Sequence, residues 1–185
     1  MPVGDVPDTD EGLVPDGGPV SDGGPVPDGE LVPDGGLVPD GELARYRALI
    51  DRWAEVERAS NPLVAAVDTD PHLDRWYVRM RGEEKATITL WLTLGQRTLQ
   101  YETYFMPAPE EQHAECFRYL LRANLKLFGM RFAVGAEDAI YLVGQMPLIA
   151  VDRGQLDRIA GSAYAYSERY FRPAMGIGYA SKFGR

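Results

Sequence analysis

The chain has 185 residues, with 28 acidic and 19 basic side chains and a formal net charge of −9. The charge is divided unevenly, because residues 1–42 contain eleven of the acidic side chains and no lysine or arginine. Subtracting these from the totals leaves 17 acidic and 19 basic side chains in residues 43–185, a net charge of +2. This nearly neutral body lacks the basic excess that binds nucleic-acid phosphates, so the composition predicts no nucleic-acid partner.

The cysteine count and the hydropathy pattern predict the compartment in which the protein is found. Cys116 is the single cysteine, which excludes an intramolecular disulfide. The first residues show neither the basic nor the apolar segment of a secretory signal. No run approaches the roughly 18 apolar residues that a membrane span needs. We therefore expect a cytoplasmic protein with no membrane partner, whose body forms one domain with a sizeable core.

Five consecutive hexapeptides occupy residues 13–42, and their sequences are LVPDGG, PVSDGG, PVPDGE, LVPDGG and LVPDGE. Each copy offers too little apolar surface to offset its ordering entropy, so we predict a disordered acidic tail over residues 1–42. Two interpretations of this tail stay open: a solubilising spacer, or an arm that docks on a basic partner or on its own domain. A repeated calcium site is disfavoured, because one carboxylate per six residues cannot fill a calcium coordination shell.

The first predicted element of the body is a helix over residues 42–59, whose apolar residues recur at spacings of three and four at Leu43, Tyr46, Ile50 and Trp53. Asn61 and Pro62 end this helix. The next segment has a weaker pattern, which is open to a short strand over residues 63–67 followed by a polar loop over residues 68–74.

Three adjacent runs, residues 75–81, 87–94 and 99–105, alternate between apolar and polar side chains. This period of two predicts a half-buried antiparallel meander in which the second run lies in the middle. If the aliphatic side packs on helices, the opposite side presents Tyr77, Arg79, Arg81, Thr87, Thr89, Trp91, Thr93, Gln100, Glu102 and Tyr104.

A second helix is predicted to begin at Pro109 and to end at Gly129. Its expected buried side consists of Ala114, Phe117, Leu120, Leu121, Asn124 and Phe128. A hairpin follows over residues 131–134 and 139–146. Asp152 is suited to cap a third helix that ends at Pro173, and residues 176–185 are expected to be a flexible C-terminus. The order α-β-β-β-α-β-β-α predicts an α+β domain over residues 43–175, with an antiparallel sheet packed against helices.

Three strings, residues 76–85, 101–109 and 137–145, resemble the bacterial YbjN family, and more narrowly its actinobacterial branch. The resemblance covers roughly residues 43–180. It implies a type III secretion chaperone-like fold, a tendency to dimerise and a loose association with sensory transduction. No catalytic residue is implied by it.

Motifs for catalysis or metal binding are incomplete. Glu110 and His113 have the spacing of half a di-iron site, but the second half is missing. His113 and Cys116 lie one helical turn apart, as a base and a nucleophile would, without an evident carboxylate to orient the base. The acidic residues 68–74 lack the glycine and glutamate of a calcium loop. We therefore predict no catalytic residue, no cofactor and no bound metal.

The sequence thus predicts a non-enzymatic, protein-binding domain with a chaperone-like or regulatory role, working as a homodimer. The predicted contact residues are Tyr77, Arg79, Trp91 and Tyr104, because aromatic residues and arginine are enriched at binding hot spots. Routine cross-strand pairing on a solvated face is the alternative explanation of the same residues. Strand addition at a sheet edge is a natural way to hold an extended client. A small-molecule-sensing domain, with a pocket between sheet and helices, is the alternative function.

Overall fold

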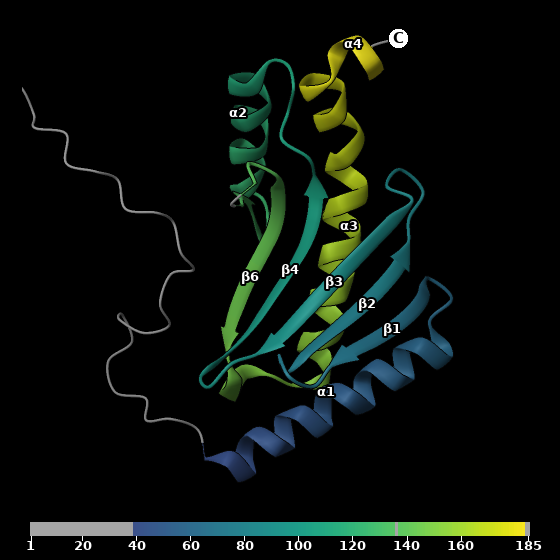
Figure 1. The fold of residues 1–185 in the computed structure, drawn as a ribbon, viewed down its shortest axis with the longest axis vertical. Helices are drawn as coiled ribbons and strands as arrows, with labels where there is room; N and C mark the ends of the chain where they lie inside the picture. The colour runs from purple at the N-terminus through teal and green to yellow at the C-terminus, as the bar shows by residue number, and fades with distance from the viewer. Residues whose placement is uncertain (1–38, 136, 184–185) are drawn as a thin grey trace, which may run out of the picture. The chain divides into compact units, whose positions relative to one another are not determined.

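The computed structural model describes residues 39–183 apart from residue 136, so the predicted acidic tail lies outside the described residues except for its last few positions. A six-stranded antiparallel sheet has the order β1-β2-β3-β4-β6-β5 (Figure 1). Its strands are β1 (Val64–Asp70), β2 (Arg75–Arg81), β3 (Thr87–Leu94), β4 (Thr98–Met106), β5 (Arg131–Val134) and β6 (Ile140–Pro147). The helices are α1 (Asp40–Ser60), α2 (His113–Asn124), the short 3-10 helix η1 (Leu148–Ala150), α3 (Arg153–Gly178) and α4 (Ala180–Phe183). The predicted α+β class is confirmed.

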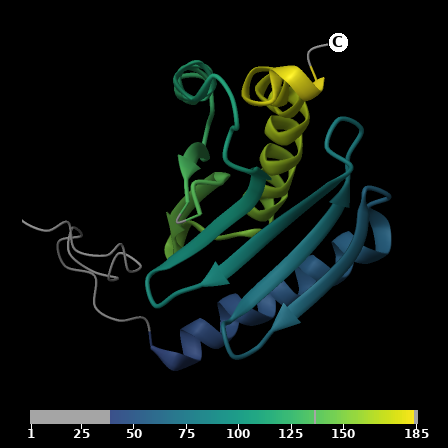
Figure 2. The same ribbon diagram turned by 45° about the horizontal axis from the view of Figure 1, so that its top comes forward.

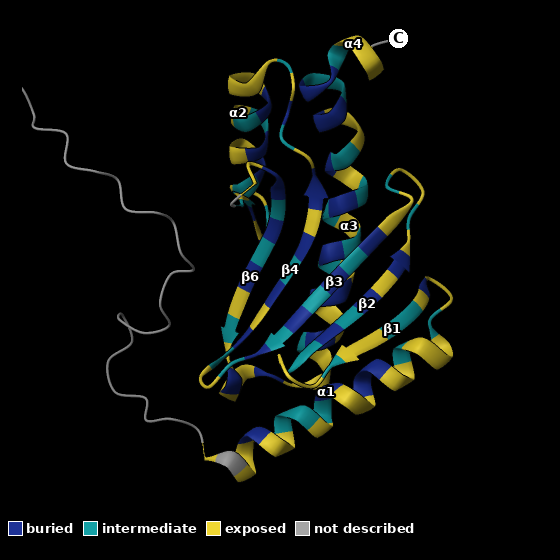
Figure 3. Ribbon diagram, viewed as in Figure 1, coloured by how far each residue is buried: buried dark blue, intermediate teal, exposed yellow. Residues whose placement is uncertain are grey.

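Helices α1 and α3 pack on one face of the sheet, and α3 runs behind β3 and β4 in Figures 1 and 2. Buried and less buried residues alternate along the strands, as the colours of Figure 3 show. Val78, Leu90 and Leu92 have no solvent exposure on the covered face. They form one core with apolar residues of the helices, including Ile50 of α1 and Leu156 of α3.

Two buried indoles join the layers. The Trp76 Nε1 of β2 donates to a carboxylate oxygen of Asp51 at 2.7 Å, and the Trp53 Nε1 of α1 donates to Asp157 of α3 at 2.8 Å. Each indole therefore buries its ring and still satisfies its N–H group, which is the usual requirement for a tryptophan in a core. These bonds fix α1 relative to both the sheet and α3.

The meander contains four strands rather than three. The predicted polar loop over residues 68–74 is wrong in its first part, because β1 continues through Asp70. β1 is an edge strand, and its pairing with β2 shifts register between Val64 and Ala66. An edge strand with a bulge exposes polar side chains on both faces, so the alternation that identified its neighbours is absent here.

Helix α2 is shorter than the predicted helix. It begins at His113 instead of Pro109, because the preceding chain is held by the end of α3, where the amides of Glu110 and Glu111 both donate to the carbonyl of Gly178 at 2.9 Å. Its buried residues are Cys116, Leu120 and Ala123. Of the side predicted to be buried, Ala114, Leu121 and Phe128 are exposed. The helix ends at Asn124, well before the predicted cap at Gly129, although Gly129 does have a positive φ of 72°.

The predicted end of the third helix at Pro173 is also wrong, since α3 continues to Gly178 and is followed by α4. Residues 176–178 and 180–183, expected in a flexible C-terminus, therefore lie in helices. Tertiary contacts offset the cost of a proline inside a helix. Ala174 and Met175 are buried, and the hydroxyl of Tyr179 donates to the carbonyl of Ala108 at 2.6 Å. The predicted start is confirmed, because the Asp152 carboxylate accepts from the amide of Gln155.

Candidate functional site: the open face of the sheet

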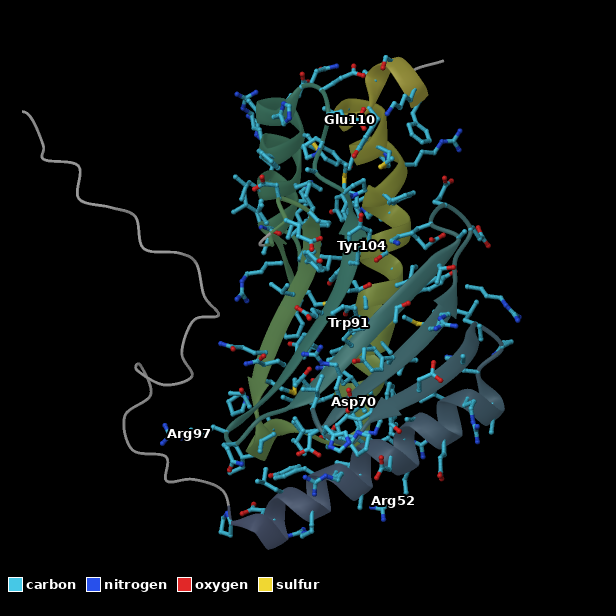
Figure 4. All side chains as sticks on the ribbon, in the orientation of Figure 1. Arg52, Asp70, Trp91, Arg97, Tyr104 and Glu110 are labelled. Atoms are coloured by element: carbon cyan, nitrogen blue, oxygen red, sulfur yellow. The ribbon has the colours of Figure 1, made fainter. Side chains whose placement is uncertain are left out.

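The sheet face opposite α1 and α3 carries all four residues that the sequence predicted as contacts. The β2–β3 register runs without a shift and pairs Tyr77 with Trp91, and β4 continues this register with Glu102 beside Trp91. The predicted parity of these strands is therefore right. We call this surface the open face, because within residues 39–183 no helix covers it (Figure 1). Figure 4 shows Trp91 near its middle, with Tyr104 beyond it toward Glu110.

Aromatic rings on the open face contact one another and nearby cations. The rings of Tyr77 and Trp91 meet edge to face, with centroids 5.7 Å apart, and those of Tyr104 and Tyr141 do the same at 5.5 Å. The Arg75 guanidinium lies 5.4 Å from the centroid of the Trp91 ring. Trp91 is nevertheless only partly buried, so part of its surface stays accessible.

Two hollows lie on either side of Trp91. The first has a volume of about 530 Å³ and is lined by Asp68, Tyr77, Arg79, Lys85, Thr87, Thr89, Trp91 and Tyr104. It therefore brings together the four predicted contact residues. The second hollow has a volume of about 320 Å³, and its lining includes Trp91, Glu102, Glu137, Tyr141 and Val143. Trp91 belongs to both hollows and forms the boundary between them.

Lys85 is a member of the first hollow that the sequence analysis missed. Its Nζ donates to the carbonyl of Thr87 at 2.9 Å and lies 5.5 Å from the centroid of the Tyr104 ring. Burial lowers the pKa of Lys85 below its ordinary value, although the Glu168 carboxylate acts in the opposite direction. Within the described residues no carboxylate forms an ion pair with Lys85. The other cation of this hollow, Arg79, makes only a long ion pair of 3.7 Å.

The loop that carries Lys85 is held by a carboxylate of α3. Glu168 accepts hydrogen bonds from the amides of Glu83, Glu84 and Lys85 at 2.8, 2.9 and 3.1 Å. Burial alone would raise the pKa of Glu168, but these three amides and the Lys85 charge outweigh it and lower the pKa below its ordinary value. A Cβ on Gly82 would lie 2.4 Å from both Glu168 Oε1 and the Lys85 carbonyl, so a glycine is required there. Lys85 thus projects from a loop of fixed conformation.

Two residues of the incomplete catalytic and metal motifs, Cys116 and Glu110, make contacts within the fold. Cys116 is buried with its Sγ 3.9 Å from the carbonyl of Ala174, and burial raises the pKa of its thiol. His113 is exposed at the start of the same helix. Glu110 forms an ion pair with Lys182 at 2.6 Å. Over the described part of the chain, no three His, Cys, Asp or Glu side chains gather as metal ligands would.

The two edges of the sheet are protected against strand addition in different ways. At β5 the side chain of Asn124 covers the edge, because its Oδ1 accepts from the amide of Phe132 at 2.7 Å and its Nδ2 donates to the carbonyl of Phe132 at 3.2 Å. The opposite edge, β1, carries the register shift after Val64 and the exposed Asp68. Both features discourage indiscriminate pairing. Strand addition at a sheet edge stays a prediction. Among the helices that the structure describes, none has the length and apolar character to cross a bilayer.

Solved structures show that the fold has been seen before. A chain from the HopA1–SchA chaperone–effector complex superimposes with a TM-score of 0.52 at 14% identity, covering 74% of this chain and 99% of that one. A chain from the crystal structure of the Yersinia pestis type III secretion chaperone SycH in complex with a fragment of YscM2 has a TM-score of 0.45 at 17% identity, over 66% of this chain and 96% of that one. The first likeness confirms the expected type III secretion chaperone-like fold.

Sequence comparison then identifies the family. The YbjN family, described as "Putative bacterial sensory transduction regulator", matches residues 52–174, and the chain belongs to this family. Uncharacterized proteins Mb0497 of Mycobacterium bovis and Rv0487 of Mycobacterium tuberculosis are 32% identical over 108 residues, which is 58% of this chain and 59% of each relative. ML2442 of Mycobacterium leprae is 30% identical over 107 residues, 58% of each chain. The matched region therefore spans under two thirds of these curated relatives.

Proposed function

We propose that this chain is a non-enzymatic, cytoplasmic protein-binding domain with a chaperone-like or regulatory role, and that it contacts its partner through the open face. One observation carries the proposal: Tyr77, Arg79, Trp91 and Tyr104 line a single hollow on a sheet face that no described helix covers. Membership of the YbjN family and a chaperone-like fold support it. Fold alone does not assign the role, so the argument depends on the chemistry of this face.

Routine cross-strand pairing explains part of the open face and leaves the rest. It accounts for the edge-to-face contact of Tyr77 with Trp91 and for the long Arg79–Asp68 ion pair. It does not require a hollow on each side of a partly exposed tryptophan, or a lysine without a carboxylate partner. Tryptophan, tyrosine and arginine in such surroundings are the residue types that dominate binding energy at protein interfaces.

Site-specific photocrosslinking tests the proposed contact. A photoreactive phenylalanine analogue at position 91 of the full chain, expressed in the source cells, is expected to form adducts with one or a few proteins. The matched control places the same analogue at Ile149, which is 91% exposed outside the sheet, and is expected to form none of them. Identical adducts at both positions, or none at position 91, would contradict the proposal.

The homodimer is proposed to form at a different surface. Leu121, Leu125, Phe128 and Val134 are 64%, 87%, 69% and 54% exposed, and they lie on or between α2 and β5, which contact each other. A group of apolar side chains this exposed is typical of an interaction surface, and a two-fold axis would let the same residues cover one another. This surface adjoins the open face, because Val134 also lines the second hollow, but it contains none of the four predicted contact residues.

Analytical ultracentrifugation tests the dimer. Leu125→Glu is expected to convert a dimer into a monomer, because it places a charge in the proposed contact. Leu73→Glu is the matched control, since Leu73 is also an exposed leucine, at 51%, but lies in the β1–β2 turn. A wild-type chain that sediments as a monomer at high concentration would contradict the dimer without affecting the open-face proposal.

Small-molecule sensing is a second candidate function, but its ligand site is now proposed on the open face instead of between the sheet and the helices. The hollow between the sheet and α3, lined in part by Tyr101, Met146 and Ile159, has a volume of only about 30 Å³. The first hollow of the open face, at about 530 Å³, has the size of a ligand site. A ligand there is expected to raise the Tm of the wild-type chain and to leave that of a Trp91→Ala chain unchanged.

A further inference from the structure

The two hollows of the open face differ in charge. The first hollow contains two cations, Arg79 and Lys85, against the single carboxylate of Asp68. Arg79 makes only the long, exposed ion pair with Asp68, and Lys85 forms no ion pair with a described carboxylate, although its Nζ donates to the carbonyl of Thr87. An exposed pair of this kind contributes little, so the Arg79 guanidinium is free to exchange Asp68 for a carboxylate of a partner.

The second hollow has the opposite character. Its lining contains two carboxylates, Glu102 and Glu137, and no basic side chain. Arg131, whose Cα pairs with that of Val143, flanks this hollow without lining it. The open face is therefore positive on one side of Trp91 and negative on the other. A binding surface with separated charges of this kind selects a partner with the complementary pattern.

The register of the strands sets the distance between the positive and the negative side chains of the open face. Arg79 lies on β2 beside Thr89, whereas Glu102 lies on β4 beside Trp91. Arg79 and Glu102 are therefore separated by two strand spacings across the sheet and by two residues along it, which is about 12 Å in total. Four residues of extended chain cover about 13 Å, and residues i, i+2 and i+4 of such a chain point to the same side.

We propose that the open face binds an extended peptide segment in which an acidic and a basic residue stand four positions apart with an apolar residue midway. The inference rests on the proposed function and adds the chemistry of the partner. The acidic side chain reaches Arg79 and Lys85, the apolar one packs on the exposed part of Trp91, and the basic one reaches Glu102 and Glu137. Because the segment lies across the face instead of along an edge, it forms no ladder of backbone hydrogen bonds, and affinity depends on its side chains.

The same charges disfavour nucleic acid and wholly basic peptides as ligands of the open face. A nucleic acid that crossed Trp91 would place phosphates beside Glu102 and Glu137, and the exposed aromatic rings alone do not compensate for this repulsion. A wholly basic segment would meet Arg79 and Lys85. A segment with both charges avoids each of these contacts.

Nuclear magnetic resonance titration of the full chain tests the inference through the indole N–H of Trp91. The probe is acetyl-Glu-Thr-Leu-Thr-Lys-amide, and the controls replace both charged residues by glutamate or both by lysine. We expect the probe to shift the Trp91 indole signal and to bind about tenfold more tightly than either control, with the difference decreasing as salt is added. Equal affinities, or shifts confined to other surfaces, would overturn the inference.

Charge reversal on either side of Trp91 sharpens the test. Lys85→Glu is expected to make the peptide with two lysines the tightest ligand, whereas Glu102→Lys is expected to favour the peptide with two glutamates. Lys126→Glu and Glu115→Lys, both at exposed positions of the α2 region, are the matched controls and should leave the original order unchanged. If Lys85→Glu does not fold, Arg79→Glu reverses the charge of the same hollow at an exposed side chain.

The outcomes separate the inference from the proposed function. Crosslinked partners at position 91 combined with peptides that do not discriminate would leave the proposed function standing and overturn the charge pattern. Tightest binding of the doubly acidic peptide by the wild-type chain would indicate a general anion site and overturn it as well. A Trp91 indole signal that shifts with protein concentration alone would assign the open face to a second copy, which is also contrary to the inference.

Discussion

The two faces of the sheet are built from the same strands but differ in how far their tryptophans are buried. On the covered face, Trp76 is 3% exposed and its indole N–H is satisfied by Asp51. On the open face, Trp91 lies one strand away, stays partly exposed and forms the boundary between two hollows. Alternation along the strands sends one tryptophan to each face, so the sheet separates the residues of its core from those that stay accessible to solvent.

This separation means that substitutions on the open face can test binding without testing folding. A residue such as Trp91 contributes little to the core, whereas its counterparts on the covered face hold α1 and α3 in place. The two layers meet at the β2–β3 loop, where Glu168 of α3 fixes the backbone that presents Lys85 to the open face.

Trp76→Ala is the substitution expected to have the largest effect on the free energy of unfolding. It removes a buried indole from the covered face, leaves a cavity and breaks the hydrogen bond to Asp51. Substitutions of this type cost about 4 kcal/mol. Urea unfolding followed by circular dichroism measures the loss. A cost near 1 kcal/mol would mean that α1 packs on the sheet much less firmly than the buried indoles indicate.

Glu168→Gln is expected to cost about 2 kcal/mol, because the amide replaces a carboxylate that accepts three backbone hydrogen bonds. It should also loosen the loop that carries Lys85, which the hydrogen exchange of the Glu83, Glu84 and Lys85 amides measures. Unchanged exchange at these three amides would show that the loop is held without the carboxylate. Glu115→Gln, at an exposed position of α2, is the control.

The contribution of Glu168 is also expected to depend on pH. Its pKa in the folded chain lies below the ordinary value of 4.5, so the ionised form is favoured by folding. The stabilisation is fully present above the ordinary pKa and is lost as the pH falls through the lower pKa of the folded chain. The difference in unfolding free energy between wild type and Glu168→Gln should therefore decrease below pH 4.5. A difference that stays constant into the acid range would contradict this assignment.

Asp74→Asn is expected to have a smaller effect. Asp74 accepts two hydrogen bonds of 2.7 Å from Arg47 of α1, and this bidentate pair lowers the pKa of Asp74. Because the two side chains are 32% and 42% exposed, the pair should contribute about 1 kcal/mol or less. Asparagine tolerates the left-handed conformation of this position, where φ is 46°, so the substitution isolates the charge. Thermal unfolding at low and high salt measures it, and a loss that salt does not reduce would point to the backbone instead.

The sequence predicted the open face well because its signal is local. Period-two alternation in β2, β3 and β4 determines which side chains share a face, and burial follows that pattern in the structure. Tyr141 shows the limit of this reasoning. Its strand also alternates, but only the strand order places β6 beside β4 and brings Tyr141 next to Tyr104.

The features that sequence reasoning missed depend on contacts between distant segments. Lys85 belongs to the first hollow because Glu168 holds its loop, 83 residues away in sequence. The late start of α2 depends on the carbonyl of Gly178. No periodic pattern contains these contacts. The predicted helix at Pro109 and the predicted helix end at Pro173 both follow from local propensities that tertiary packing overrides.

Trp91→Ala is the matched counterpart of Trp76→Ala, and we expect it to change the unfolding free energy by less than about 1 kcal/mol. It removes the edge-to-face contact with Tyr77 and the stacking of Arg75, but leaves every residue of the covered face in place. At the same time it should abolish the shift caused by the Glu-Thr-Leu-Thr-Lys peptide, now followed at the Tyr77 amide, while Trp91→Phe retains part of it. A loss of several kcal/mol in Trp91→Ala would instead make this tryptophan a structural residue, and the distinction between the two faces would no longer hold. A small loss of stability together with loss of binding is the combination that only a contact residue produces.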